Sequence, residues 1–185
     1  MTGFWVLVAV VVLLAVALVA SYNRFVRQRN LVQESWRQID VELTRRHDLV
    51  PNLVETVKGY AAHERETLEA VTAARAAAAS TGSGPAAQAV QENALSGALR
   101  QLFAVAEAYP DLKASTNFLD LQRQLAETED RIAAGRRFYN GNVRALNTRV
   151  EAFPSSLVAK TFGFAKAEYF TADDPQVRAT PAVSF

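Results

Sequence analysis

Few residues of this chain have the type and spacing that enzyme chemistry requires. The chain has no Cys and two His, His47 and His63, so disulfides, thiolate metal sites and cysteine nucleophiles are excluded. His63-Glu64 begins like a metalloprotease helix, but the second His of that motif would stand at the position of Thr67. We therefore expect no metal site, and we expect both histidines to be solvated or to cap helices.

The carboxylates and the loops offer no catalytic pattern either. Glu127 and Glu129 are two residues apart, so on a helix they point in different directions and form no acid-base pair. The sequence STGSGP from Ser80 to Pro85 lacks the Lys and the strand of a phosphate loop. We expect no enzymatic activity and no cofactor, and the net charge of +1 favours no nucleic-acid partner.

A set of polar side chains lies in or beside the apolar stripes of the predicted helices. Charged groups near a helical core persist when they are paired, so interhelix hydrogen bonds and ion pairs are one interpretation. A polar groove that binds a partner is the other. The set consists of Arg45, Arg46, Asp48, Asn52, Glu64, Glu107, Tyr109, Glu129, Arg137, Tyr139, Asn140 and Asn147.

The elements that position these residues begin with an apolar segment. Every residue from Phe4 to Ala20 is apolar, and at about 1.5 Å per residue the segment and its uncharged flanks reach the roughly 30 Å of a hydrocarbon core. Phe4, Trp5 and Tyr22 are aromatic residues at the two ends, where the headgroup region favours them. A cleaved signal peptide is the alternative, but residues 1–3 carry no basic side chain. We predict a transmembrane helix.

Three arginines directly after this segment predict its orientation. Arg24, Arg27 and Arg29 precede the first acidic residue, Glu34. The positive-inside bias then places the N-terminus outside and the rest of the chain in the cytoplasm. The same arginines are also candidate contacts for anionic lipid headgroups.

Apolar residues at spacings of three, four and seven predict four long helices after the span. The first leads out of the membrane and breaks or kinks near residues 48–50, because Pro51 suits the first turn of a new helix and not a helix interior. The second runs from Pro51 to about Ala79, the third over about 86–108, and the fourth from about Asn117 to Phe153. Their predicted core includes Val32, Trp36, Ile39, Leu43, Val50, Leu53, Val57, Tyr60, Leu68, Val71, Val90, Leu95, Leu99, Leu102, Phe103, Ala106, Phe118, Leu121, Leu125, Ile132, Tyr139, Val143, Leu146 and Val150.

No segment outside the span alternates with the period of a strand, so we expect almost no sheet. The predicted fold class is all-α, an N-terminal transmembrane helix followed by an antiparallel bundle of long helices. We expect an anchor over 1–22, a helical bundle over 23–170 and a flexible tail over 171–185. A short helical turn after Pro154 leads to aromatic residues Phe162, Phe164, Tyr169 and Phe170.

Charge is unevenly distributed along the second half of the chain. Residues 131–153 hold five Arg and one Glu, whereas residues 85–130 hold seven acidic and three basic side chains. The two segments either neutralise each other inside one bundle or pair between neighbouring copies of the chain.

Several blocks of residues, taken in order, resemble the LemA family of bacteria. The resemblance spans residues 4 to about 170. It rests on Tyr22-Asn23, Trp36 with Gln38-Ile39-Asp40-Val41, the run from Arg45 to Val54, Val57-Lys58-Gly59-Tyr60, His63-Glu64, the run from Tyr109 to Ala114, the run from Leu125 to Glu129, Arg131-Ile132, Arg137 with Tyr139-Asn140, Asn147 and Phe153-Pro154.

The resemblance implies a single-span protein of the bacterial plasma membrane, with its N-terminus outside and a helical bundle in the cytoplasm. No enzymatic activity is established for the family, so the resemblance implies none for this chain. Some relatives are associated with internal bacterial membranes, and family genes often lie near those of membrane zinc proteases. We expect a non-enzymatic scaffold that contacts the lipid bilayer and self-associates as a homo-oligomer. The alternative is an adaptor or regulator of a membrane-protein partner such as a membrane zinc protease.

Overall fold

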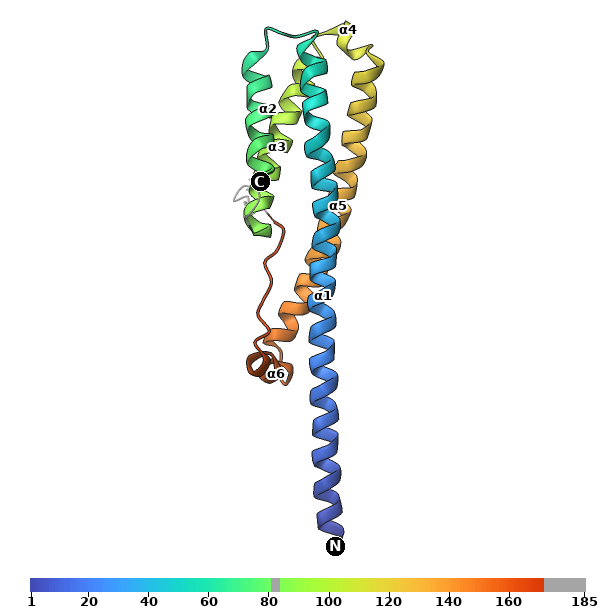
Figure 1. Cartoon of the computed structure of the whole chain (residues 1–185), viewed down its shortest axis with the longest axis vertical. Helices are drawn as coiled ribbons and strands as arrows, with labels where there is room; N and C mark the ends of the chain where they lie inside the picture. The colour runs from blue at the N-terminus through green and yellow to red at the C-terminus, as the bar shows by residue number, and fades with distance from the viewer. Residues whose placement is uncertain (81–83, 172–185) are drawn as a thin grey trace, which may run out of the picture. The chain divides into compact units, whose positions relative to one another are not determined.

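A computed structural model describes residues 1–80 and 84–171, and the described residues contain helices and no strand. The helices are α1 (Thr2–Lys58), α2 (Arg65–Ala78), α3 (Pro85–Ala106), α4 (Pro110–Lys113), α5 (Thr116–Glu151) and α6 (Ser155–Phe162), as Figure 1 shows. The predicted all-α fold class is confirmed. The predicted flexible tail, apart from Thr171, lies outside the described residues.

The chain divides into two compact units. Unit 1 consists of Met1–Ile39 and Ala134–Glu168, and unit 2 consists of Asp40–Ala133 and the residues from Tyr169 onward. The helices α1 and α5 each contribute one part to each unit.

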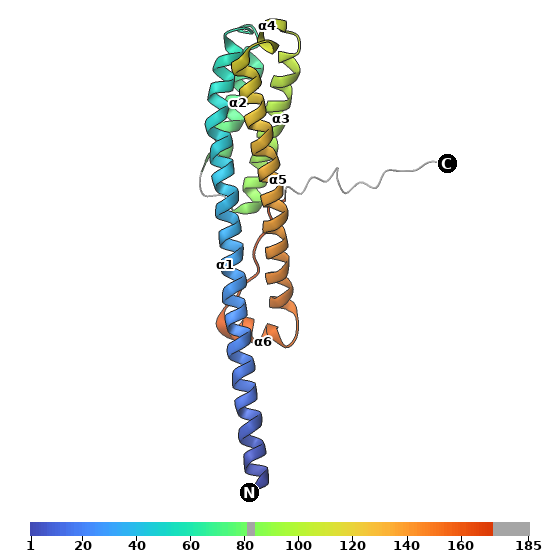
Figure 2. The same ribbon diagram turned by 90° about the vertical axis from the view of Figure 1, so that its right-hand side faces the viewer.

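Unit 2 is an antiparallel arrangement of four helical segments, the C-terminal part of α1, then α2, α3 and the N-terminal part of α5 (Figures 1 and 2). Each segment contributes apolar residues at spacings of three or four, and burial of these residues provides most of the stability of such a bundle. The core contains Val50, Leu53, Val57, Leu68, Val71, Leu95, Leu99, Leu102, Leu112, Phe118 and Leu125.

Two predicted core residues of unit 2 are exposed. Tyr60 was predicted to lie on the buried face of a continuous helix, but α1 ends at Lys58 and Tyr60 lies in the turn before α2. The amide nitrogens of Tyr60 and Ala61 both donate to the carbonyl of Val57, a shared bond that ends the helix. Val90 is also exposed, because Glu92 occupies the next buried position of α3.

Unit 1 begins with a segment that has no packing partner. Residues 1–20 are all exposed, and the first buried residue is Phe25, whose ring stacks on that of Phe164 at 4.7 Å between centroids. From there the C-terminal part of α5 and α6 pack along α1, and Figure 2 shows the start of α1 standing free. By length and composition α1 is the helix of the described chain that is able to cross a membrane.

The predicted break before Pro51 is wrong, because α1 continues through Pro51 to Lys58. A proline at this position has no N–H for the carbonyl four residues earlier, which is that of His47. The Nε of Arg75 on α2 donates to this carbonyl at 3.1 Å instead. A side chain from a neighbouring helix thus supplies the hydrogen bond that Pro51 cannot make.

The four aromatic residues near the C-terminus are divided between the two units. Phe162 and Phe164 lie at 5.0 and 5.6 Å from the ring of Tyr22 in unit 1. The chain then passes into unit 2, where Phe170 is buried and Tyr169 is exposed.

Candidate functional site

The buried guanidinium of Arg46 is the centre of a polar network in unit 2. Arg46 lies on the inner face of α1 and is 2 % exposed. Its Nη1 donates to Glu129 Oε2 at 2.8 Å, and its Nη2 donates to Ser96 Oγ at 2.7 Å and to the carbonyl of Glu92 at 3.0 Å. Side chains of α1, α3 and α5 therefore meet at one cation.

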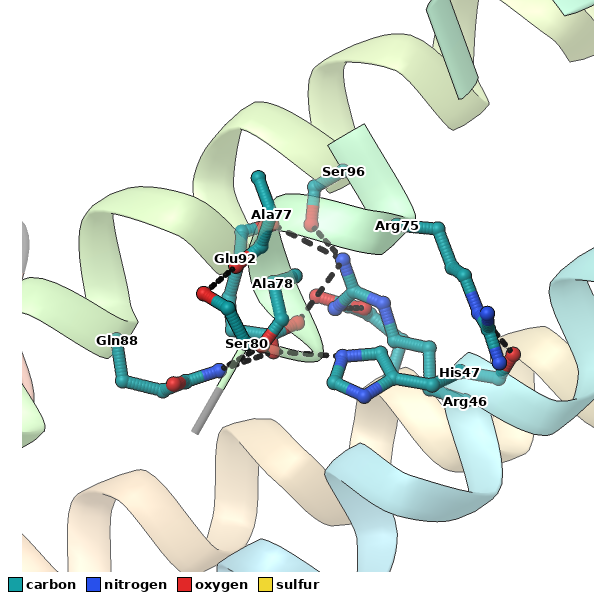
Figure 3. A network of polar contacts seen from close by, with 10 residues as sticks. Arg46, His47, Arg75, Ala77, Ala78, Ser80, Gln88, Glu92 and Ser96 are labelled. Carbon is teal, nitrogen blue, oxygen red and sulfur yellow. Dashed lines mark hydrogen bonds and ion pairs between the residues drawn. The ribbon is translucent and has the colours of Figure 1, made fainter. Parts of the chain in front are cut away.

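Glu92 on α3 is the second member of this network and is 4 % exposed. Its Oε1 lies 2.8 Å from His47 Nε2 and accepts a hydrogen bond from Gln88 Nε2 at 2.8 Å. Its Oε2 lies 3.7 Å from Arg46 Nη2. Figure 3 shows these side chains converging between the helices. The prediction that His47 is solvated or caps a helix is wrong, because His47 is buried against Glu92.

Burial of the charged groups in this network costs free energy, and pairing of opposite charges offsets that cost. Removing a charge from water carries a penalty that only a close counter-charge and hydrogen bonds offset. Arg46 has one fully buried carboxylate, that of Glu92, and one half-exposed carboxylate, that of Glu129. Within the described residues the Nε of Arg46 and the Oε2 of Glu92 have no hydrogen-bond partner. The guanidinium is thus held in place by neighbours on two other helices, α3 and α5.

A groove of about 480 Å³ opens beside Arg46, between α3 and α5. Leu99, Phe103 and Leu125 form its apolar wall, and Ser96 and Glu129 lie with Arg46 at its polar side. An apolar surface with a few convergent polar groups is typical of a binding site. The Nη1 and Nη2 donors of Arg46 are already occupied by protein acceptors, and its Nε has no hydrogen-bond partner among the described residues.

Glu64 and Tyr109 form a second pair in unit 2. The Tyr109 Oη donates to Glu64 Oε1 at 3.0 Å, which joins the turn before α2 to the residue before α4. This hydrogen bond, together with partial desolvation and the Glu64 charge, raises the pKa of Tyr109. The pair connects two turns and is separate from the Arg46 network.

Tyr139 and Asn147 bind the backbone of the segment after α6 in unit 1. Asn147 Nδ2 donates to the carbonyl of Ala167 at 2.9 Å, and the Ala167 amide donates back to Asn147 Oδ1 at 2.8 Å. Tyr139 Oη donates to the carbonyl of Glu168 at 2.8 Å. Burial, with a smaller effect of the Glu168 charge, raises the pKa of Tyr139 to about 12. These side chains fix a segment that has no regular structure of its own.

The other polar residues predicted from the sequence are placed outside these groups. Arg45 and Asn140 are half-buried, and Asp48, Asn52, Glu107 and Arg137 are exposed. Sequence reasoning missed Glu92, His47 and Ser96. A signal for Glu92 was available, because it precedes Leu95, Leu99 and Leu102 at spacings of three, four and three on the buried stripe of α3.

The residues predicted to meet the membrane lie at the start of α1. Phe4, Trp5 and Ala20 are exposed on the unpacked segment, and the ring centroids of Phe4 and Trp5 are 5.7 Å apart. Arg24, Arg27 and Arg29 are exposed, and the Arg29 guanidinium lies 5.6 Å from the ring centre of Phe164. These three arginines therefore lie in the part of α1 where its packing against other helices begins.

A family model described as the LemA family matches residues 35–185 of the chain. Magnetosome protein MamQ 2 of Paramagnetospirillum magneticum is 29 % identical over 193 residues, which cover 89 % of this chain and 71 % of that protein. Magnetosome protein MamQ of Magnetospirillum gryphiswaldense is 26 % identical, with coverage of 83 % and 65 %. Protein LemA of Metamycoplasma hominis is 28 % identical, with coverage of 84 % and 71 %. The matched region contains the whole Arg46 network.

Proposed function

We propose that this chain, which belongs to the LemA family, is a membrane-anchored helical scaffold. In this proposal it functions by assembly and not by enzymatic turnover of a substrate. The observation that supports this most is the form of α1. Its exposed apolar residues 2–20 pass directly into the packed helix of unit 1 at Phe25, with no linker between them. A helix of this kind joins a bilayer to a folded domain.

The proposed location is the bacterial plasma membrane, with the N-terminus outside and the helical units in the cytoplasm. Arg24, Arg27 and Arg29 follow the apolar segment, and no Lys or Arg precedes it in the sequence given. Such an asymmetry favours retention of the arginine-bearing side in the cytoplasm.

The proposed partner is a second copy of the same chain. Anchoring in a bilayer raises the effective concentration of neighbouring copies, so weak lateral contacts are sufficient for assembly. Exposed large apolar residues, including Leu119 and Phe138 on α5, provide contact area for them. Three relatives are named magnetosome proteins, a name that supports a part in building a cellular structure and specifies no reaction.

Crosslinking in native membranes tests this proposal. A short amine-reactive crosslinker added to membranes should give a ladder of bands that mass analysis assigns to this chain alone. Bands at the monomer mass only, under conditions that crosslink a known membrane oligomer, would contradict the scaffold.

An adaptor for a membrane-protein partner is the second candidate, and the groove beside Arg46 favours it. In this case crosslinking yields a stoichiometric second protein, such as a membrane zinc protease. The change Phe103→Asp in the apolar wall should abolish that product, whereas Val90→Asp, at an exposed position of α3 that does not line the groove, should leave it unchanged.

A further inference from the structure

A second groove of about 480 Å³ lies in unit 1 and is lined with cations. Arg24 on α1 and Arg144 and Arg149 on α5 contribute to its wall, together with Thr148 and with Ser155 at the start of α6. Of the residues that the structure describes, no Asp or Glu lines it. The groove thus gathers positive charge from two helices in a single concave surface.

The arginines of this groove have no ion-pair partner among the described residues. Among the described residues, Arg24, Arg144 and Arg149 have no carboxylate within 4.0 Å. Burial and the neighbouring charge of Arg24 lower the pKa of Arg149. The buried Nε of Arg149 has no hydrogen-bond partner in the described part of the chain, and its guanidinium lies 5.7 Å from the ring centre of Phe25. An anion in the groove would relieve the repulsion between these arginines.

One end of the groove lies on α1 directly after the segment that is predicted to cross the membrane. A bilayer has about 5–8 Å of headgroup region on each side of its hydrocarbon core. At a rise of about 1.5 Å per residue, Arg24 lies roughly 3 Å beyond Tyr22 and Gln28 roughly 9 Å beyond it. Both residues line the groove. When the hydrocarbon core ends near Tyr22, the Arg24 end of the groove therefore lies within the headgroup layer, and the Gln28 end lies just beyond it.

Exposed apolar side chains flank the same groove. Phe153 lies between the lining residues Ala152 and Ser155 and is 81 % exposed, and Leu157 on α6 is 58 % exposed. Phe162, at the end of α6, packs edge-on against Tyr22. Aromatic and aliphatic residues beside cations are typical of a surface that enters the membrane interface.

We infer that this groove binds the phosphate of an anionic phospholipid headgroup from the leaflet at which α1 leaves the bilayer. The inference rests on the proposed membrane anchoring. It adds the groove as a second contact with the bilayer, beside the apolar segment of α1. A membrane lipid fits better than free phosphate because Phe153 and Leu157 provide apolar contacts beside the cationic groove, at the depth of the headgroups.

The test uses the full chain in mild detergent with phosphatidylglycerol, phosphatidylcholine or inorganic phosphate added. Native mass spectrometry counts the molecules that remain bound. The wild type should retain phosphatidylglycerol in preference to phosphatidylcholine, and excess inorganic phosphate should not displace it. The change Arg144→Gln should weaken this retention about fivefold, which corresponds to about 1 kcal/mol for one arginine near a membrane surface.

The matched control is Arg136→Gln, which makes the same change on the same helix about two turns earlier. Arg136 is exposed and does not line the groove, so this variant should retain the lipid as the wild type does. Equal retention by Arg144→Gln and the wild type would overturn the headgroup site. Displacement by inorganic phosphate would overturn the assignment to a lipid.

Flotation with vesicles of phosphatidylcholine and phosphatidylglycerol separates this inference from the proposed anchoring. A chain that floats with the vesicles but shows no lipid preference is anchored and has no headgroup site. A chain that does not float contradicts the anchoring and the headgroup site together.

Discussion

At the scale of single residues, the environment of Arg46 explains why Glu92 and Glu129 are not equivalent. Both carboxylates contact the same guanidinium, but the side chain of Glu92 is 5 % exposed and that of Glu129 is 55 % exposed. Water screens the exposed carboxylate, whereas the buried one is the main compensation for two buried groups, Arg46 and His47.

The change Glu92→Ala should therefore destabilise the chain by about 3–5 kcal/mol, because it leaves a buried cation without its buried partner. Glu129→Ala should cost about 1 kcal/mol or less. Urea titration of the full chain in mild detergent, followed by its helical circular dichroism, measures both. Similar losses for the two variants would show that burial does not control the strength of these pairs.

At this scale, sequence patterns predict which side chains are buried better than they predict which side chains contact each other. The spacing of apolar residues places Arg46 beside the apolar stripe of α1, and in the structure its side chain is buried. The spacing of Glu92 to the buried leucines of α3 is a signal for its burial, but its pairing with Arg46 was not predicted, because spacing along one helix does not identify the facing helix or its cation. His47 was assigned to solvent for the same reason.

At the scale of elements, apolar periodicity predicts the existence of the helices and fails at their junctions. The long helix α5 and the positions of its buried residues Leu125, Ile132 and Val143 follow from spacing alone. The turn at residues 59–64 and the short α4 were not predicted. The continuity of α1 at Pro51 depends on Arg75, a residue of another helix, so no local pattern contains it.

A double-mutant cycle tests the role assigned to Arg75. Arg75→Ala removes the donor to the His47 carbonyl and should cost about 1–3 kcal/mol. In the background of Pro51→Ala, the backbone N–H of residue 51 provides that donor, so the same change should cost about 1 kcal/mol less. Stability is measured by urea titration of the full chain. Strictly additive effects would mean that Arg75 does not compensate for the proline.

Two glycines of α5 are predicted to respond in opposite directions to alanine. A Cβ at Gly135 would lie 3.0 Å from Ile39 Cγ1, so Gly135→Ala should destabilise unit 1 by about 1 kcal/mol or more. A Cβ at Gly141 would meet no atom within 4 Å, so Gly141→Ala should stabilise the helix by about 0.5–1 kcal/mol. Thermal melts of the two variants check the signs. Equal shifts would show that α1 and α5 do not approach closely at Gly135.

At the scale of the whole molecule, the proposed topology makes a prediction about access from each side of the membrane. The natural chain has no Cys, so single cysteines report without background. An impermeant maleimide should label Thr2→Cys in intact cells and should label Ser80→Cys only after the cells are opened. The opposite pattern would reverse the orientation and contradict a cytoplasmic scaffold.

The mass of the purified full chain as a function of concentration and salt tests the central claim, assembly of an anchored chain, most directly. In mild detergent at low salt, light scattering should give a protein mass well above the 20.2 kDa of one chain. This mass should fall toward the monomer as salt screens the charge pairs between the arginine-rich residues 131–153 of one copy and the acidic residues 85–130 of the next. A monomer at every concentration and every salt level would contradict the account.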